Sequence, residues 1–496
     1  MSKKLYYSAC SLLSPHIGLI IDDVISSKKA HDVIYWCYCK NALSSCFGNL
    51  NGSPPICQFC HNMYRRYGAK YGENVHMIPI DKKNFVHSIH YWSFDSVEEI
   101  RSIIYKHVYI GDSILSLYVT YTRDQDVKDI DSFRSFFKQI VDDICDFVDF
   151  SYELIAQIRP DEIISYNGRL FDNRLFYDVA NAMGIQYTSL EVEFGNGYPL
   201  RKVHFSGGLP HSIKINTQKI LDLWDYSPLT KERKIDIASS FFVRRRDGEL
   251  IADVAIYTSL QESGKLPSKF DITKRNIAIF NSSPDEFFAL GDEWEKTLFP
   301  SQYEAIEYML NHSSSVFHYY LRMHPNLKSV NNKACLDLYN LEKYDNLTII
   351  PPDSNVSTYS LMEVCEKVIT FGSTMGVEAS FWGKPSILLG RSLYENLDAC
   401  YRVSSKEEVI SLIEGYLEPK SKIGAIKYAY YLLDREFKVD KTNIDIDIRG
   451  RYFLGREFRF TSYFKIWGSQ ILYQIAYFYY CILLPKFYKP SQIFPG

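Results

Sequence analysis

The sequence predicts an α/β protein that folds as two lobes of similar size, and three observations lead to that prediction. The chain has 496 residues, which exceeds the size at which a single hydrophobic core keeps growing. Short apolar segments alternate with helical segments along most of its length, a pattern typical of parallel sheets covered by helices. A polar stretch rich in Lys, Gly and Pro, near residues 262 to 275, interrupts that pattern and has the composition of an interdomain linker.

Composition narrows the class of protein. With 46% hydrophobic and 23% charged residues the chain is an ordinary globular protein rather than a disordered or fibrous one. A net charge of −3 gives no electrostatic reason to expect nucleic acid as a partner. The N-terminus lacks the long apolar region and the small-residue cleavage site of a secretion signal, so we expect a cytoplasmic protein.

The first lobe is expected to span residues 1–265. KLYYSAC and DVIYWCYC are strand candidates, and SPHIGLIIDDVISSKKA between them has helical spacing. Further along, DEIISYNG is a buried strand that ends in a turn, NRLFYDVANAMG is a helix that a glycine ends, and IQYTSLEVEF is the next strand. These segments predict consecutive βαβ units.

The second lobe, residues 276–445, is expected to repeat the same alternation. Its strand candidates are IAIF, VFHYYLRM, NLTIIPP, KVITF and PSILLG, and its helix candidates include SQYEAIEYMLNH, STYSLMEVCE and TMGVEASFW. The sequence thus predicts two Rossmann-like lobes with a cleft between them.

The last segment, residues 446–496, is expected to be an aromatic helical tail. Residues 466–485 contain no charged side chain and are long enough to cross a membrane. Two Gln, one Ser and five Tyr or Trp residues favour instead a helix that packs on the first lobe or lies at a membrane surface. These alternatives stay open at the level of sequence.

Eleven cysteines include a local group in the first lobe. Cys39, Cys46, Cys57 and Cys60 would be sufficient for a structural zinc site with four thiolates. Their spacings match no common zinc module, so reduced cysteines without metal are the alternative. We expect no disulfides in a cytoplasmic chain.

Polar residues follow two of the strands predicted for the second lobe. Arg322 and His324 follow one strand, and Gly372, Ser373 and Thr374 follow another, where a helix is expected to begin. Ligands of open α/β sheets bind at the carboxyl ends of the strands, and helix starts favour phosphate groups. Glu378 lies about one helical turn further on, where a carboxylate can accept both hydroxyls of a ribose.

These residues belong to a longer pattern. The segment YSLMEVCEKVITFGSTMGVEASFWGKPSILLG, preceded by the RMHPN of 322–326, resembles the donor lobe of GT-B glycosyltransferases of bacterial capsule and O-antigen biosynthesis. The likeness covers roughly residues 318 to 394, and SYNGRLFDNRLFYDVANAMGI followed by LEVEFG resembles their acceptor lobe more weakly.

The resemblance implies a role for each matching residue of the second lobe. Glu378 would bind the ribose of the nucleotide, and the Gly-Ser-Thr turn at 372–374 would hold its phosphates. Arg322 and His324 would offset the charge of the leaving group, so that catalysis would require no metal or other cofactor.

In the first lobe the resemblance implies an acceptor site. His16 or Glu193 would serve as general base. Asn167, Arg169 and Glu191 would bind the acceptor or the donor sugar. The run Arg244 to Arg246 would contact an acceptor pyrophosphate or anionic lipid, with a solvated loop as the alternative.

The expected function is transfer of a sugar from a UDP-, GDP- or CMP-linked donor to a growing lipid-linked glycan of capsule or lipopolysaccharide. The expected location is the cytoplasmic face of the inner membrane, with contact to its surface. One alternative is a nonhydrolysing UDP-sugar 2-epimerase, although RSLYENL replaces the Thr-Glu-Arg-Pro-Glu stretch of those enzymes. The other alternative is a noncatalytic assembly or export protein with the same fold.

Overall fold

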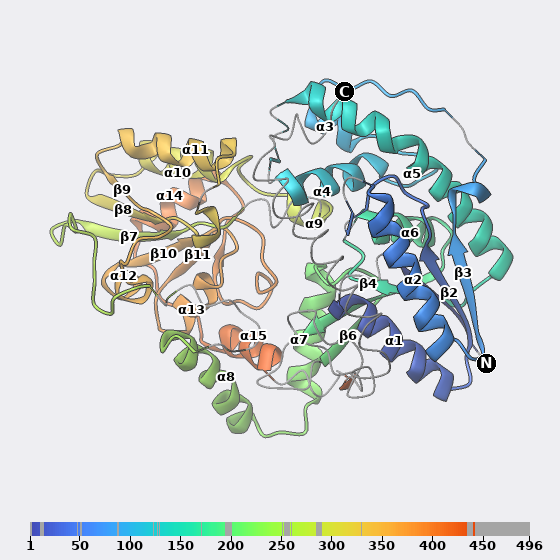
Figure 1. Cartoon of the computed structure of the whole chain (residues 1–496). Helices are drawn as coiled ribbons and strands as arrows, with labels where there is room; N and C mark the ends of the chain where they lie inside the picture. The colour runs from blue at the N-terminus through green and yellow to red at the C-terminus, as the bar shows by residue number, and fades with distance from the viewer. Residues whose placement is uncertain are drawn as a thin grey trace, which may run out of the picture. The chain divides into compact units, whose positions relative to one another are not determined.

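The computed structural model describes residues 2–433 and 440–441, apart from short gaps at 10–13, 47, 50–51, 87–88, 123, 126, 128, 170, 194–200, 250, 252–257, 259, 284–289 and 329. The described chain forms two compact units, coloured along the sequence in Figure 1. The first unit extends to Glu193 and includes residues up to Pro210, and the second begins at His211. The boundary therefore precedes residue 265, where the sequence led us to expect it. The tail at 446–496 lies outside the described residues.

The first unit is built on a seven-stranded sheet with the order β13-β6-β5-β4-β1-β2-β3. Strands β1 to β5 are parallel, whereas β6 runs antiparallel to β5 and β13 antiparallel to β6. The strands are β1 (Lys3–Ser8), β2 (Val33–Cys39), β3 (Val75–Ile80), β4 (Glu162–Tyr166), β5 (Gln186–Glu193), β6 (Arg201–Ser206) and β13 (Asp440–Lys441).

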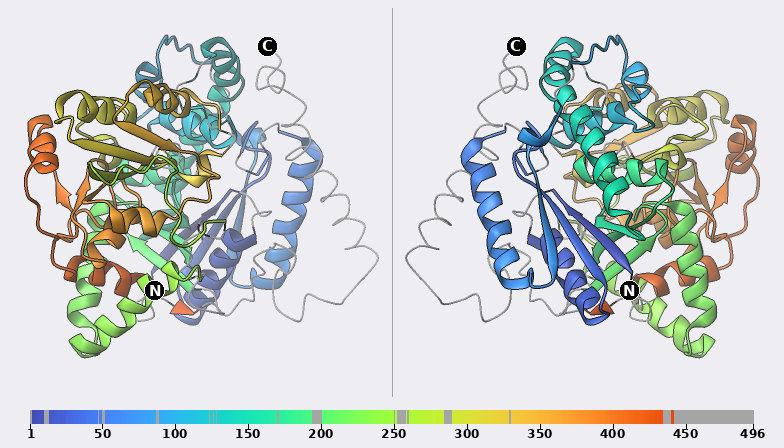
Figure 2. Two further views of the ribbon diagram at one scale, coloured as in Figure 1. Left: turned by 90° about the vertical axis from the view of Figure 1, so that its left-hand side faces the viewer. Right: turned by 90° about the vertical axis from the view of Figure 1, so that its right-hand side faces the viewer.

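Helices cover both faces of this sheet, as the two views of Figure 2 show. They are α1 (Ser14–Lys29), α2 (Pro54–Tyr71), α3 (Val97–Arg101), α4 (Ile110–Thr122), α5 (Ile130–Ile158) and α6 (Phe171–Ala182). Successive side chains of a strand point to opposite faces. Tyr6 thus reaches α1, where its hydroxyl donates to Asp23 at 2.7 Å. Its neighbour Tyr7 packs on the other face, against Phe147 of α5 and Phe176 of α6.

The second unit is built on a six-stranded parallel sheet with the order β12-β11-β10-β7-β8-β9. Counted along the chain this is the doubly wound order 3-2-1-4-5-6, so both units are Rossmann-like, as the sequence predicts. The strands are β7 (Arg275–Phe280), β8 (Phe317–Arg322), β9 (Leu347–Ile350), β10 (Lys367–Thr370), β11 (Ser386–Leu388) and β12 (Tyr401–Arg402).

Two helices of the second unit, α7 and α8, precede its sheet in the sequence. The helices of the unit are α7 (Ile213–Tyr226), α8 (Lys231–Arg246), α9 (Asp292–Glu295), α10 (Gln302–His312), α11 (Lys333–Tyr339), α12 (Thr358–Val364), α13 (Met375–Phe381), α14 (Lys406–Glu414) and α15 (Ile423–Leu433). Buried Trp224 of α7 and Phe242 of α8 share one apolar core with Phe381 of α13 and Tyr430 of α15. This shared core explains why the unit boundary lies before α7.

The polar segment expected to be a free linker is hydrogen-bonded to the second unit. The amide of Glu262 donates to the carbonyl of Asn355 at 2.9 Å, and the amide of Gly264 donates to the Ser360 hydroxyl at 3.0 Å. The amide of Ser357 in turn donates to the carbonyl of Lys265 at 2.9 Å. The segment is therefore part of the second unit.

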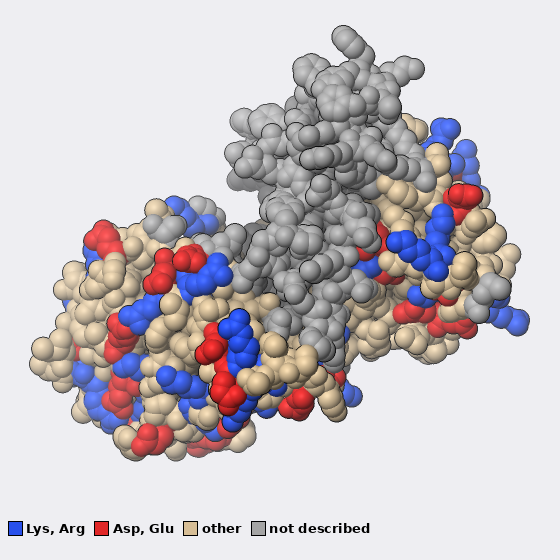
Figure 3. Space-filling view, turned by 90° about the horizontal axis from the view of Figure 1, so that it is seen from below, with Lys and Arg blue, Asp and Glu red and all other residues tan. Residues whose placement is uncertain are grey.

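The distribution of charge and the polarity of the helices bear on binding to nucleic acids and membranes. Acidic and basic side chains are intermixed over the face of the molecule seen in Figure 3. Within the described part of the chain, the helices are too short or too polar to cross a membrane.

Candidate functional site

The strand order of the second unit places a topological switch point at the carboxyl ends of β7 and β10, because the connections from these neighbouring strands leave toward opposite sides. Asn281 and Ser282 follow β7, and Gly372 and Ser373 follow β10 shortly before α13. Gly372 has a φ of 120°, a conformation that residues with a Cβ atom rarely adopt. The Ser373 hydroxyl accepts the amide of Met375 at 3.3 Å, and the hydroxyl of Tyr394 donates to the Ser373 carbonyl at 2.5 Å. The sequence-predicted turn at 372–374 thus lies at the topological switch point.

His324, which follows β8, lies beside this switch point. Its backbone amide donates to the side-chain carbonyl of Asn281 at 2.6 Å. Its ring Nδ1 accepts the amide of Asn326 at 3.2 Å. A nitrogen that accepts carries no proton, so the neutral ring is protonated on Nε2. The structure therefore joins His324 to the loop after β7.

Arg322, the last residue of β8, is a buried cation that forms no ion pair in the described structure. Arg322 is 4% exposed, and its guanidinium donates to the backbone carbonyls of Pro351 and Ser354. Within the described residues no carboxylate lies within 4.0 Å of it, and its Nε has no hydrogen-bond partner. Burial lowers the pKa of Arg322 to about 10, with the charge of Asp353 opposing that shift. The group therefore remains positive at neutral pH.

Glu378 has a different environment from the one the sequence led us to expect. It is 0% exposed, and its two carboxylate oxygens accept Nε of Arg245 at 3.1 Å and the hydroxyl of Tyr359. The expectation was a carboxylate that faces a ribose, whereas here α8 and α12 surround it. Burial tends to lower the pKa of Arg245, but the Glu378 carboxylate outweighs burial and raises it. The ribose contact stays a prediction.

The arginine run that includes Arg245 forms the last turn of α8 rather than a solvated loop. Arg244 pairs with Glu249 at 2.6 Å. Arg246 pairs with Glu363 and lies over the ring of Trp382, 4.8 Å from its centroid. Each arginine thus has an acidic partner within the second unit.

The first unit has its own switch point, between β1 and β4. Asn167 follows β4 with a φ of 58°, and its side-chain amide donates to Glu191 of β5. Glu191 also accepts the hydroxyl of Tyr166 at 2.7 Å. The amide of Arg169 donates to the Asn167 side chain at 3.0 Å. The structure therefore brings together Asn167, Arg169 and Glu191, which the sequence proposed as acceptor or sugar ligands.

His16 and Glu193, which the sequence analysis proposed as general bases, cannot be placed in this site. His16 belongs to α1 and Glu193 ends β5, but the side chains of both lie outside the described residues. Their catalytic roles stay predictions.

Sequence reasoning missed Asp172 in the first turn of α6. This residue is 1% exposed; one carboxyl oxygen accepts the amide of Asn173 at 3.0 Å, and the other has no partner in the described structure. Burial raises its pKa to about 7. The signal available in the sequence was an aspartate that stands among apolar residues in the segment RLFDNRLF, a position that indicates a buried acid.

The four cysteines proposed as zinc ligands form no disulfide in the described structure. Cys57 Sγ accepts the side-chain amide of Asn49 at 3.1 Å, and burial raises its pKa to about 11. Among the side chains that the structure describes, no three His, Cys, Asp or Glu are arranged to hold a metal ion. Zinc binding by Cys39, Cys46, Cys57 and Cys60 stays a prediction.

Comparisons with known proteins find only distant likeness. No family model and no curated protein sequence matches the chain. KpsC of Thermosulfurimonas dismutans, a beta Kdo 2,4 transferase, matches with a TM-score of 0.36 and 14% identity over 54% of this chain and 79% of that one. The UDP-GlcNAc 2-epimerase of Neisseria meningitidis bound to UDP-GlcNAc has a TM-score of 0.26 and 12% identity over 86% and 98% of the two chains. The glycosyltransferase SsfS6 of Streptomyces sp. SF2575, complexed with thymidine diphosphate, has a TM-score of 0.20 and 10% identity over 88% and 96%. Likeness at this level gives no argument for a substrate.

Proposed function

We propose that this protein is a nucleotide-sugar-dependent glycosyltransferase of bacterial surface-polysaccharide synthesis, and that its second unit binds the nucleotide. The observation that supports this most is the buried, positively charged Arg322 at the carboxyl edge of the sheet. A buried guanidinium that forms no ion pair is unfavourable in a protein interior unless an anion binds it. A nucleotide phosphate supplies such an anion.

The neighbouring groups suit the same ligand. The turn at Gly372 and Ser373 lies at the switch point, where doubly wound sheets bind nucleotides. His324 lies beside this turn, and its amide is held by the side chain of Asn281 at 2.6 Å. Positive charge and hydrogen-bond donors at this edge stabilise the nucleotide phosphate as it leaves the anomeric carbon.

The first unit is proposed to bind the acceptor, a growing and lipid-linked glycan. Asn167, Arg169 and Glu191 supply hydrogen-bonding groups of the kind that sugar hydroxyls require. A lipid-linked acceptor would place the enzyme at the cytoplasmic face of the inner membrane.

Thermal-shift titration of the full chain with UDP-, GDP-, CMP- and dTDP-sugars tests the nucleotide site. A ligand that binds the folded protein raises its stability by RT ln(1 + [L]/Kd), about 2.7 kcal/mol at one hundred times Kd. We expect one nucleotide class to raise Tm in the wild type. We expect Arg322→Gln to weaken its affinity about 10-fold to 100-fold, because a hydrogen bond to a charged group contributes about 1.5–3 kcal/mol.

Arg275→Gln is the matched control. Arg275 begins strand β7, at the opposite end of the same sheet, and pairs with Glu366 at 2.5 Å. The Arg275→Gln substitution should reduce the free energy of unfolding slightly and leave nucleotide affinity unchanged. Equal affinity in the wild type and Arg322→Gln would contradict the assignment of the phosphate site.

Product analysis in the same panel separates the alternatives. A glycosyltransferase releases free nucleotide from its donor, slowly even with water as acceptor. A UDP-sugar 2-epimerase interconverts two UDP-sugars without releasing nucleotide, and an assembly protein does neither.

A further inference from the structure

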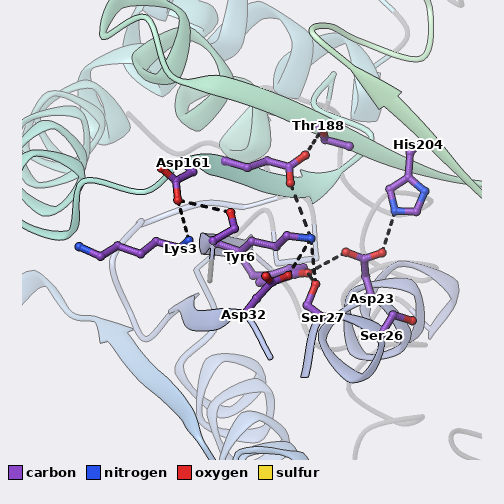
Figure 4. Close-up of polar contacts among 12 residues, drawn as sticks. Lys3, Tyr6, Asp23, Ser26, Ser27, Asp32, Asp161, Thr188 and His204 are labelled. Atoms are coloured by element: carbon purple, nitrogen blue, oxygen red, sulfur yellow. Dashed lines mark hydrogen bonds and ion pairs between the residues drawn. The ribbon is translucent and has the colours of Figure 1, made fainter. Parts of the chain in front are cut away.

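A histidine and an aspartate of the first unit form a hydrogen-bonded pair that Figure 4 shows. Nε2 of His204, in β6, lies 2.7 Å from Oδ1 of Asp23 in α1. The other carboxylate oxygen of Asp23 accepts the hydroxyl of Tyr6 at 2.7 Å. Lys202, which is 0% exposed, lies 2.8 Å from Asp23 and 3.0 Å from Asp22. The partners of Asp23, which lies in α1, therefore come from two strands, β1 and β6.

These contacts keep Asp23 ionised and direct a protonated ring nitrogen of His204 toward it. Burial tends to raise the pKa of Asp23, but the hydrogen bond from His204 and the charge of Lys202 outweigh burial and hold that pKa well below its usual value. An ionised carboxylate only accepts hydrogen bonds, so the proton of the neutral His204 ring lies on Nε2. Nδ1 then has the free lone pair.

The ring is open to a substrate. The His204 side chain is 31% exposed, whereas that of Asp23 is 6% exposed. Figure 4 shows the second ring nitrogen directed away from Asp23, and within the described structure it makes no hydrogen bond. A basic nitrogen that a buried carboxylate orients is the arrangement of a general base in nucleophilic catalysis.

The strand register places this base at the carboxyl edge of the sheet. His204 is paired with Leu190 of β5, and Leu190 is paired with Tyr166, the last residue of β4. The next residue after Tyr166 is Asn167, at the switch point of the first unit. His204 is thus level with the edge at which an open α/β sheet binds its ligand.

We propose that His204 is the catalytic base of the transfer reaction, with Asp23 as its positioning residue; this inference rests on the proposed glycosyltransferase function. In a direct displacement, Nδ1 of His204 takes the proton of the acceptor hydroxyl while that oxygen forms its bond to the anomeric carbon. The bond from the anomeric carbon to the phosphate oxygen breaks, and its electron pair leaves with the nucleotide. The Asp23 carboxylate stabilises the imidazolium that results.

The competing explanation is structural. Asp22 and Asp23 are two buried acids with one buried lysine between them, so His204 would serve only to complete the hydrogen bonding of Asp23. The test must therefore separate loss of a base from loss of a hydrogen bond. His204→Gln does so, because glutamine can still donate to Asp23 but cannot take a proton.

The experiment measures nucleotide release from the donor identified by the panel, with water as acceptor, in the full chain. General base catalysis typically contributes about 10²-fold to 10⁴-fold, so His204→Gln should lower kcat by at least about 10²-fold. The KM for the donor should remain unchanged, and the rise of kcat with pH in the wild type should disappear. In His204→Ala, added imidazole should restore part of the lost rate. The control is His76→Gln, because His76 stacks on Tyr35 in the same sheet and contacts no acid in the described structure.

Each outcome has a distinct meaning. If His204→Gln retains kcat within threefold of the wild type, the base assignment is wrong although the protein remains a transferase. If His204→Gln is inactive and has a lower Tm than the wild type, and imidazole does not restore activity to His204→Ala, then His204 is structural. If the wild type releases no nucleotide from any donor, the proposed function fails, and this inference fails with it.

Discussion

Asp172 in the first unit and Arg322 in the second are both buried without an ion-pair partner in the described structure, yet the two residues have different consequences. Burial raises the pKa of Asp172 to about 7 and lowers the pKa of Arg322 to about 10. Each shift favours the neutral form of the group. Near pH 7 the aspartate can become neutral by taking a proton, whereas the guanidinium stays charged.

This difference separates a tolerated buried charge from one that indicates a ligand. Protonation removes the charge of Asp172 within the folded unit, so Asp172 needs no partner. Arg322 has no such escape, and its carbonyl contacts with Pro351 and Ser354 and the charge of Asp353 compensate it only in part. An anion is therefore expected at Arg322 and not at Asp172.

Arg245 and Glu378 complete the comparison, because they are buried together. Arg245 is 12% exposed and Glu378 is 0% exposed, at a distance of 3.1 Å. Here each group satisfies the other, and neither demands a ligand. The pair joins α8 to α13, so it should stabilise the second unit.

The largest expected effect comes from breaking this pair. Arg245→Met leaves the Glu378 carboxylate buried with Tyr359 as its remaining partner. Removal of one partner of a buried ion pair costs about 3–5 kcal/mol. Urea unfolding should show this loss of unfolding free energy in the transition of the second unit. Arg245→Met combined with Glu378→Gln should recover part of it, and a loss below about 1 kcal/mol in the single variant would contradict a stabilising pair.

The next largest effect is a pH-dependent change in unfolding free energy caused by Asp172, which forms no ion pair in the described structure. The pKa of Asp172 is about 7 in the folded protein and about 4 in the unfolded chain, so the folded state holds the proton more tightly. Its favourable contribution is fully present below about pH 4 and is lost as pH rises through 7. Asp172→Asn is neutral at every pH. The variant should therefore gain on the order of 2–3 kcal/mol over the wild type between pH 5 and pH 8.

Denaturant unfolding at both pH values measures this change. Asp178→Asn is the control, because Asp178 lies on the same helix but pairs with Arg174 at 2.9 Å. That variant should lose stability instead. A wild type and Asp172→Asn with parallel pH dependence would show that Asp172 ionises normally.

Local patterns in the sequence were sufficient for much of the fold. Alternation of apolar and helical segments predicted β1, α1 and β2, the β4–α6–β5 unit and most strands of the second sheet. The turn at Gly372 was found because glycine, serine and threonine directly follow an apolar strand. Asn167, Arg169 and Glu191 were proposed because their segments resemble the acceptor lobe of GT-B glycosyltransferases.

Contacts between distant segments could not be predicted. Arg245 and Glu378 are 133 residues apart, and His204 and Asp23 are 181 residues apart, so no local pattern relates them. The same reason explains the misplaced unit boundary. The apolar faces of α7 and α8 are complementary to α15, which lies far along the chain, and composition alone placed the boundary at the polar segment that follows α8.

The smallest expected effect comes from the neighbour of Arg245 on the same turn of α8. Arg244 pairs with Glu249 at 2.6 Å, but the two side chains are 36% and 54% exposed. Water already solvates both charges, and exposed pairs typically contribute about 0–1 kcal/mol. Arg244→Met should therefore change the unfolding free energy by less than about 1 kcal/mol, in the same urea experiment that tests Arg245→Met. Equal losses in the two variants would mean that burial of the ion pair is not what distinguishes these adjacent arginines.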